Sequence, residues 1–324
     1  MVECDIKSQS VWKCIRLIGS FLLLFFLLSG IGYTDVFEIL SRATLWPILL
    51  CILIILGGRG LIAYRWHLLV RTSTTDVGFL RLLHVVMVSG FLGFLMPGAV
   101  GVEVVRVHAL ARRTDLTLAL SSVVVERLTG LLALIGFVLV GLLFAPINLP
   151  GMIGVAVVVV IAVLSVTAIS LFVHPVRTFY FALLAGRMLT PLRERLIKFY
   201  RQIDSFRNAT WLLPQLAALS IALQLLRVLE VIALAVALDV QADLAYMFVI
   251  APLGIFAMLL PISFGGLGVR EALYVALFGA IGVDAAPAFA LSFLNFVLST
   301  MFIVVPGGIL YAFGGLIAEE EGSR

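Results

Sequence analysis

The chain has 324 residues, of which 63% are hydrophobic and only 12% are charged, and its formal net charge is +4. A soluble domain carries about 25% charged residues, so this composition excludes a protein whose surface is mostly in contact with water. Several apolar blocks reach the roughly 20 residues that a helix needs to span a hydrocarbon core of roughly 30 Å. We therefore expect an all-α integral membrane protein with no soluble domain large enough to fold on its own.

In chain order, six segments predict full transmembrane helices: 15–33, 45–69, 116–145, 152–173, 211–238 and 286–316. The first is interpreted as a retained helix, because its apolar run is long and no signal-peptide cleavage site follows it. Two further apolar stretches, 79–111 and 245–283, are interrupted by Pro97–Gly101 and by Pro261–Gly268. Each interruption leaves segments of about 15 residues, or about 22 Å of helix, which are too short to cross.

The positive charges predict how these segments are oriented. The basic amphipathic segment 174–207 carries seven arginines and lysines, so the positive-inside rule places it in the cytoplasm. Each full span moves the chain to the other side of the membrane. Counting the spans from this segment places both ends of 79–111 inside and both ends of 245–283 outside. We therefore expect two oppositely oriented re-entrant hairpins, with cytoplasmic termini, in the cell membrane. Two full spans in place of the first hairpin agree equally well with the positive-inside rule. The evidence against them is the short length of the two segments and the proline and glycine residues between them.

The order helix, helix, hairpin, helix occurs twice in the chain. The sequence therefore predicts one membrane domain, 1–324, built from inverted halves of about 15–145 and 152–316 that a short outer loop at 146–151 joins. The two hairpins share an internal spacing, since Pro97, Gly101, Val105 and Arg106 correspond to Pro261, Gly265, Val269 and Arg270. Inverted repeats with broken helices near the midplane are a recurring design of transporters.

Charged side chains at membrane depth are the candidate functional residues, because each costs about 2.5–3.5 kcal/mol to insert. The topology places nine of them there: Arg59, Arg106, Arg127, Arg227, Arg270, Glu103, Glu126, Glu230 and Glu271. Residues three apart share a helix face, which predicts pairing within Glu103–Arg106 and within Arg227–Glu230. Neighbours in sequence do not share a face, so Glu126 and Glu271 are expected to reach other helices. One interpretation is structural, with ion pairs that only lock helices together.

The other interpretation is a binding site for an anion. Arg106 and Arg270 each follow a glycine-rich break, where the start of a half-helix exposes backbone N–H groups that attract anions. Arginine adds a bidentate fork that suits phosphate. On this interpretation glycines admit the head group, and carboxylates position the arginines or bind a cationic part of it. The remaining candidate substrate-binding residues are Glu103, Glu126, Glu230, Glu271, Arg127, Arg227, Pro97, Gly98, Gly101, Pro261, Gly265, Gly266 and Gly268.

Three stretches carry a resemblance to a known family: Pro97–Arg106, Glu126-Arg127-Leu128 and Pro261–Glu271, with Arg65-Trp66 as a fourth match. The chain resembles, over nearly its whole length, the lysylphosphatidylglycerol synthase transmembrane-region family, also called flippase-like. A similar membrane domain in the multiple peptide resistance factor flips aminoacylated phosphatidylglycerol, whereas a separate soluble domain makes that lipid. The resemblance therefore implies lipid translocation, and we expect no lipid synthesis by this chain.

Three functions stay open. The first is a translocase for an anionic lipid, such as an aminoacyl-phosphatidylglycerol or a polyprenyl-phosphate-linked lipid. The second is a non-catalytic membrane partner of a glycosyltransferase or lipid synthase, and the third is a membrane-embedded lipid-phosphate transferase with Glu103 or Glu271 as base. The sequence contains no phosphate-binding GxxxxGK[ST] loop, no HExxH and no paired CxxC. We expect no metal, no cofactor and no nucleic-acid partner, and leave oligomerisation open.

Overall fold

The computed structural model describes residues 19–20, 22–72, 77–96, 100–144, 158, 162, 190–259 and 266–316, and every regular element in these ranges is a helix. The predicted all-α membrane fold is confirmed, because four of these helices are long and apolar enough to cross a bilayer. They are α3 (Leu45–Val70), α6 (Leu116–Phe144), α10 (Leu212–Ala237) and α13 (Ala285–Gly314). Each agrees with a predicted span to within a few residues. The predicted span 152–173 lies outside the described residues, except for Val158 and Ala162.

The N-terminal segment bends sharply where the sequence predicts the end of a span. Helix Leu22–Ile31 is followed by α2 (Tyr33–Ser41), and the two are bent by 84°. Gly32 joins them with a φ of 98°, in the left-handed region that glycine adopts without penalty. The sequence predicts no helix at α2. Its acidic Asp35 and Glu38 stand among exposed aromatic residues, a pattern typical of a helix lying at a membrane surface.

Both interrupted apolar stretches form pairs of short helices, as predicted. The first pair is α4 (Phe79–Leu95) and α5 (Gly101–Ala111), and the second is α11 (Leu244–Leu259) and α12 (Val269–Gly279). Gly266 and Gly268 have φ values of 85° and 84°, so the turn into α12 requires glycine. Residues 97–99 and 261–265 of the predicted breaks lie outside the described ranges, and with them the candidate site residues Pro97, Gly98, Pro261 and Gly265.

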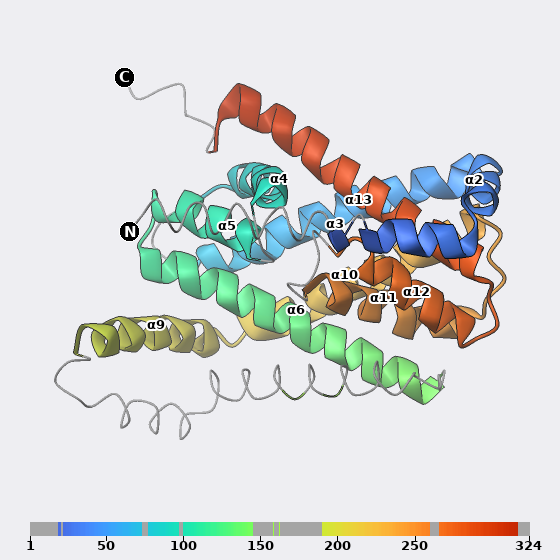
Figure 1. Cartoon of the computed structure of the whole chain (residues 1–324). Coiled ribbons are helices and arrows are strands. Elements are labelled where there is room, and N and C mark those ends of the chain that lie inside the picture. Colours follow the sequence, from blue (N-terminus) through green and yellow to red (C-terminus); the bar gives the residue numbers. More distant parts are fainter. Residues whose placement is uncertain are drawn as a thin grey trace.

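The two central helices of the bundle, α3 and α10, run in opposite directions. The N–H of Thr44 before α3 donates to the carbonyl of Ala237 at the end of α10 over 2.8 Å. Around this pair, α4 packs on α13 and α11 packs on α6, so each hairpin lies against the last helix of the other half (Figure 1). The joint at 146–151 lies outside the described residues, and the division into 15–145 and 152–316 stays a prediction.

Glycines let the exchanged helices approach closely. A Cβ atom on Gly141 of α6 would lie 2.9 Å from the carbonyl oxygen of Phe248 in α11, and one on Gly307 of α13 would collide with the carbonyl oxygen of Met87 in α4. Small residues at helix contacts are typical of membrane bundles, where backbone proximity improves packing. These contacts fix the positions of both hairpins relative to the long helices.

Helix α9 (Thr190–Asn208) lies within the predicted basic segment 174–207, whose first part, 174–189, is outside the described residues. Its buried Ile203 and Phe206 pack against Leu68 and Leu69 of α3 and against Leu216 of α10. The apolar face of α9 therefore covers the ends of transmembrane helices, a contact that the sequence does not predict. The cytoplasmic location of this segment stays a prediction.

Candidate functional site: a charged cavity within the helix bundle

A cavity of about 420 Å³ lies inside the bundle, and its walls come from α3, α4, α5 and α6 of the first predicted half and α10, α11, α12 and α13 of the second. Nine charged side chains line it: Arg59, Arg65, Arg106, Arg127, Arg227, Arg270, Glu103, Glu126 and Glu230. Ion pairing or water must offset the cost of charge at this depth. The arrangement of these side chains therefore shows which charges are balanced and which are available.

The first hairpin is fastened to α6 by two ion pairs. Arg106 of α5 donates to the carboxylate of Glu126, and both side chains are buried. Glu103 of α5 pairs with Arg127 of α6. The predicted pairing of Glu103 with Arg106 is therefore wrong, whereas the expectation that Glu126 reaches another helix is right. Because α5 packs along α6, each arginine meets the carboxylate of the facing helix in preference to the one on its own.

An aromatic ring completes the surroundings of Arg106. Its guanidinium carbon lies 4.3 Å from the centre of the Trp66 ring, within the range of cation–π attraction. The Trp66 indole N–H donates to the Ser122 hydroxyl over 3.1 Å, which fixes the ring against α6. Arg106 is thus held by a carboxylate on one helix and a ring on another.

Arg65 is a cavity residue that the sequence analysis did not select. The predicted topology places it at the cytoplasmic end of the second span, but in the structure it is only 2% exposed. It donates to the main-chain carbonyl of Glu126 over 2.7 Å and to the Thr129 hydroxyl over 2.9 Å. The helix continues for more than a turn beyond Arg65, which draws the residue into the bundle. The one sequence signal for it is the Arg65-Trp66 match in the family resemblance.

The second hairpin is fastened to α13 through Arg270. Its guanidinium donates to Glu271 Oε1 over 2.5 Å, to the Ser292 carbonyl over 2.7 Å and to the Ser292 hydroxyl over 3.1 Å. The Phe296 ring lies 5.2 Å away. Arg270 and Arg106 therefore share a design, in which a buried carboxylate and an aromatic ring hold a hairpin arginine at the cavity wall.

Glu271 reaches another helix, as the sequence predicts, but it also binds its neighbour Arg270, which the sequence does not predict. Its Oε2 accepts the Gly268 N–H over 2.5 Å and so caps the start of α12, while Oε1 binds the neighbouring Arg270. The link to α13 is the Ser292 hydroxyl, which donates to Oε1 over 3.3 Å. Capping brings the carboxylate back over its own first turn, where the arginine before it can meet it.

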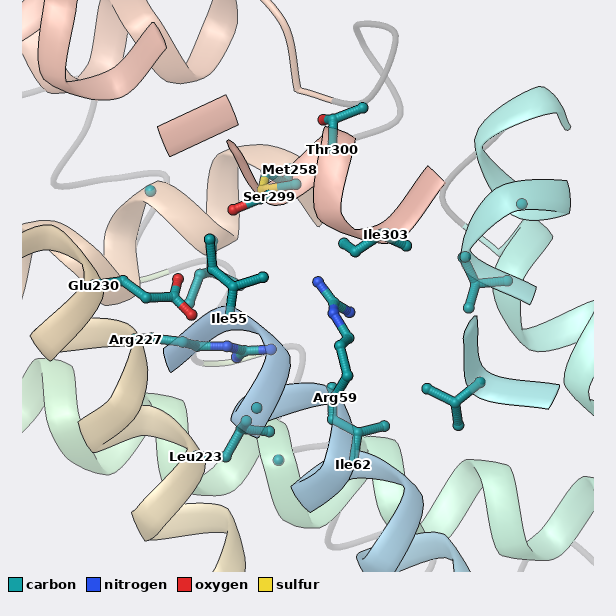
Figure 2. A pocket seen from close by; sticks show the side chains of 18 of the residues that line it. Ile55, Arg59, Ile62, Leu223, Arg227, Glu230, Met258, Ser299, Thr300 and Ile303 are labelled. Carbon is teal, nitrogen blue, oxygen red and sulfur yellow. The ribbon is translucent and has the colours of Figure 1, made fainter. Parts of the chain in front are cut away.

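A third group of charges, Arg59 on α3 with Arg227 and Glu230 on α10, faces the cavity from the central helix pair (Figure 2). Arg227 donates to Gln224 over 3.3 Å. Neither Arg59 nor Glu230 forms a hydrogen bond or an ion pair with any part of the chain that the structure describes, although Glu230 interacts electrostatically with both arginines. The predicted Arg227–Glu230 ion pair is therefore not formed. The sequence analysis counted Arg59 at membrane depth and left it out of the site.

The glycines of the breaks shape the hairpin turns. Gly101, Gly266 and Gly268 stand at or just before the starts of α5 and α12, and none of the three is among the residues that line the cavity. The Gly268 N–H is already bonded to Glu271. The role predicted for these glycines, to admit a head group to backbone amides, stays a prediction.

Three buried polar atoms in the described residues lack a hydrogen-bond partner: Arg65 Nε, Arg106 Nε and Glu103 Oε2. Buried polar groups are rarely left unsatisfied, and all three belong to side chains of the cavity wall. The described ranges contain no group of three or more histidine, cysteine, aspartate and glutamate side chains that could hold a metal ion.

A family model described as the lysylphosphatidylglycerol synthase TM region matches residues 14–307, a range that includes all the residues that line the cavity. No curated protein and no solved structure matches the chain.

Proposed function

Because the chain belongs to the lysylphosphatidylglycerol synthase transmembrane-region family, a family of membrane proteins with a lipid-related role, we propose that it translocates an anionic or phosphate-bearing lipid between the leaflets of the cell membrane. The observation that carries this proposal is the cavity of about 420 Å³, which both predicted halves line with arginine and glutamate. A charged head group cannot cross roughly 30 Å of hydrocarbon unaided, and a polar cavity inside the bundle offers it a path.

In this proposal the two hairpins supply opposite walls of the path. Arg106 and Arg270 line the cavity while Glu126 and Glu271 fix their orientation. The Nη1 groups of both arginines form no hydrogen bond with the described residues, so each keeps donors for a head group. Glu103 and Arg127 form an ion pair on the side of the path that the first hairpin supplies.

The ends of the bundle differ in charge, and we propose that the basic end is cytoplasmic. The ends of α3 and α5 lie at the end of the bundle where α9 is found, and α2 lies at the opposite end (Figure 1). Arg71 and Arg112 terminate α3 and α5, and Lys198 and Arg201 lie on α9. The segments at the opposite end carry Asp35, Glu38, Asp239, Asp243 and Asp284, with Arg42 paired to Glu38. The positive-inside rule assigns the basic end to the cytoplasm.

Reconstitution into phosphatidylcholine liposomes that contain fluorescent phosphatidylglycerol tests the proposal. A membrane-impermeant reductant bleaches only the outer leaflet of protein-free liposomes. In liposomes that contain the chain, we expect bleaching to extend to the inner-leaflet pool, with or without an imposed pH gradient and membrane potential. An inner pool that stays protected under every condition contradicts translocation. Co-purification of the inactive chain with a glycosyltransferase or a lipid synthase would then favour the non-catalytic partner.

A further inference from the structure

Most of the charge in the cavity is balanced by contacts within the chain. Arg106 pairs with Glu126, Arg127 with Glu103, and Arg270 with Glu271 just behind the wall. Arg65 is bonded to a main-chain carbonyl and to a hydroxyl. What remains is the group on the central helices, in which two arginines, Arg59 and Arg227, face one carboxylate, Glu230.

Arg59 is the most available cation of this group. Its side chain extends from α3 into the cavity toward Ile303 of α13 (Figure 2), and Ser299 and Thr300 of the same helix also line the cavity. It has neither a hydrogen bond nor an ion pair to the described residues. On its own helix, Ile55 and Ile62 flank it within one turn on either side. An arginine with apolar neighbours and no hydrogen bond or ion pair among the described residues is costly inside a membrane bundle, and such residues mark ligand or ion paths.

Arg59 and Arg227 occupy equivalent places in the two central helices. Each lies near the middle of its helix, and α3 and α10 run antiparallel. The position of Gly58 lies against the Leu223 side chain, since a Cβ there would be 3.7 Å from it, which brings the two arginine-bearing turns together. The pair therefore stands about halfway through the bundle, with one arginine from each predicted half. An anion crossing from either leaflet would meet both guanidinium groups at the same depth.

Resting on the proposed translocase function, we propose that Arg59 and Arg227 form the subsite that receives the phosphate group of the transported lipid, and that Glu230 competes with this phosphate for them. Two guanidinium forks converging on one space match the oxygens of a phosphate. Glu230 is the carboxyl group that lines the cavity beside these two arginines. A bound phosphate therefore displaces or repels this carboxylate, which keeps binding weak enough for release.

The affinity of the full chain for short-chain phosphatidylglycerol in a neutral detergent tests this subsite. Arg59→Ala removes charge-assisted hydrogen bonds, so we expect affinity to fall by about tenfold to a hundredfold. Arg59→Lys keeps the positive charge but lacks the bidentate guanidinium group, so its affinity should lie between those of the wild type and Arg59→Ala. Arg42→Ala, the same change at an exposed arginine outside the cavity, should leave affinity unchanged.

Glu230→Gln provides a readout of opposite sign. It removes the competing charge and keeps the side-chain shape, so we expect tighter binding of phosphatidylglycerol. Misfolding cannot produce such a gain. Diacylglycerol with the same acyl chains but no phosphate should bind equally to the wild type, Arg59→Ala and Glu230→Gln.

The outcomes separate the subsite from the translocase. Unchanged affinity in Arg59→Ala, or equal binding of phosphatidylglycerol and diacylglycerol, overturns the subsite. If inorganic phosphate displaces the lipid, a free phosphate group is sufficient for binding. If it does not, and lipid affinity still depends on Arg59, the site binds phosphate only as part of a lipid. Arg59-dependent binding without lipid movement keeps the subsite and refutes the translocase. Lipid movement, together with a lipid affinity that does not depend on Arg59, keeps the translocase and refutes the subsite.

Discussion

At the scale of single residues, Arg106 and Arg270 illustrate how a membrane bundle keeps an arginine at a cavity wall. Each is buried, each binds a carboxylate, and each lies near an aromatic ring. Replacing both members of a buried ion pair with neutral groups is often harmless, whereas removing one member leaves an uncompensated charge. Each hairpin arginine is therefore stable only where its carboxylate partner holds it in the bundle.

We predict that Arg106→Met destabilises the chain by about 3–5 kcal/mol, because Glu126 is left buried and unpaired. The double variant Arg106→Met with Glu126→Gln should recover most of that loss. Unfolding in mixed micelles of a neutral detergent and dodecyl sulfate measures the free energy of unfolding of the single and the double variant. Equal stability of the single and double variants would show that the pair is not coupled.

Arg127→Met is the matched control, since it breaks an ion pair of the same hairpin. The Arg127 side chain is 47% exposed, in contrast to that of Arg106. The Glu103 side chain is 15% exposed, so water can reach this pair in part, and the variant should lose less stability than Arg106→Met in the same measurement.

The sequence predicted which charged residues gather inside the bundle better than it predicted their partners. Spacing along one helix favoured Glu103 with Arg106, yet Glu126 of the facing helix binds Arg106. Proximity within a helix can be read from residue numbers, whereas proximity between helices depends on how α5 lies on α6. Arg59 was left out of the site for the same reason, because no residue near it in sequence offers a charge to pair with.

At the scale of elements, the helix contacts depend on particular glycines. We predict that Gly307→Ala destabilises the chain by about 1–3 kcal/mol, because the new methyl group would overlap the carbonyl oxygen of Met87 in α4. Gly136→Ala makes the same change inside α6, where nothing lies within 4 Å of the new Cβ, and should be neutral or stabilising by about 0.5–1 kcal/mol. Thermal unfolding in one detergent, followed by circular dichroism, compares the two. A larger loss in Gly136→Ala would contradict the described contact of α4 with α13.

Run length and breaker residues were sufficient to predict most of the described helices. The four long apolar runs became α3, α6, α10 and α13, and both interrupted runs became pairs of short helices. Helix α2 was missed because it is too short and too polar for a span, and its formation depends on the bend at Gly32. The packing of α9 was missed because amphipathicity identifies an apolar face without identifying what covers it.

At the scale of the whole molecule, the exchange of hairpins makes the cavity a joint product of both predicted halves. α4 lies on α13, α11 lies on α6, and the antiparallel pair α3 and α10 runs between them. No single half could enclose the nine charged side chains, because four helices from each half line the cavity. These nine side chains therefore come together only when both halves are assembled.

The sides of the membrane assigned to the connections can be tested with single cysteines in a variant that lacks Cys4, Cys14 and Cys51. Gln241→Cys lies in the exposed connection between α10 and α11, at the acidic end of the bundle. We expect it to react with a membrane-impermeant maleimide in intact cells. Arg112→Cys, at the exposed end of α5, should react only after the membrane is permeabilised. The reverse pattern would invert the proposed orientation.

Val100→Cys decides whether the first hairpin turns back inside the membrane. Val100 is 63% exposed between α4 and α5, which have 17 and 11 residues. At 1.5 Å per residue these helices measure about 25 Å and about 17 Å, and neither reaches the roughly 30 Å of a full crossing. Two full spans would place Val100 at the outer surface, where its cysteine would be labelled as readily as that of Gln241→Cys. A re-entrant hairpin keeps it below that surface, so we expect no labelling of Val100→Cys in intact cells.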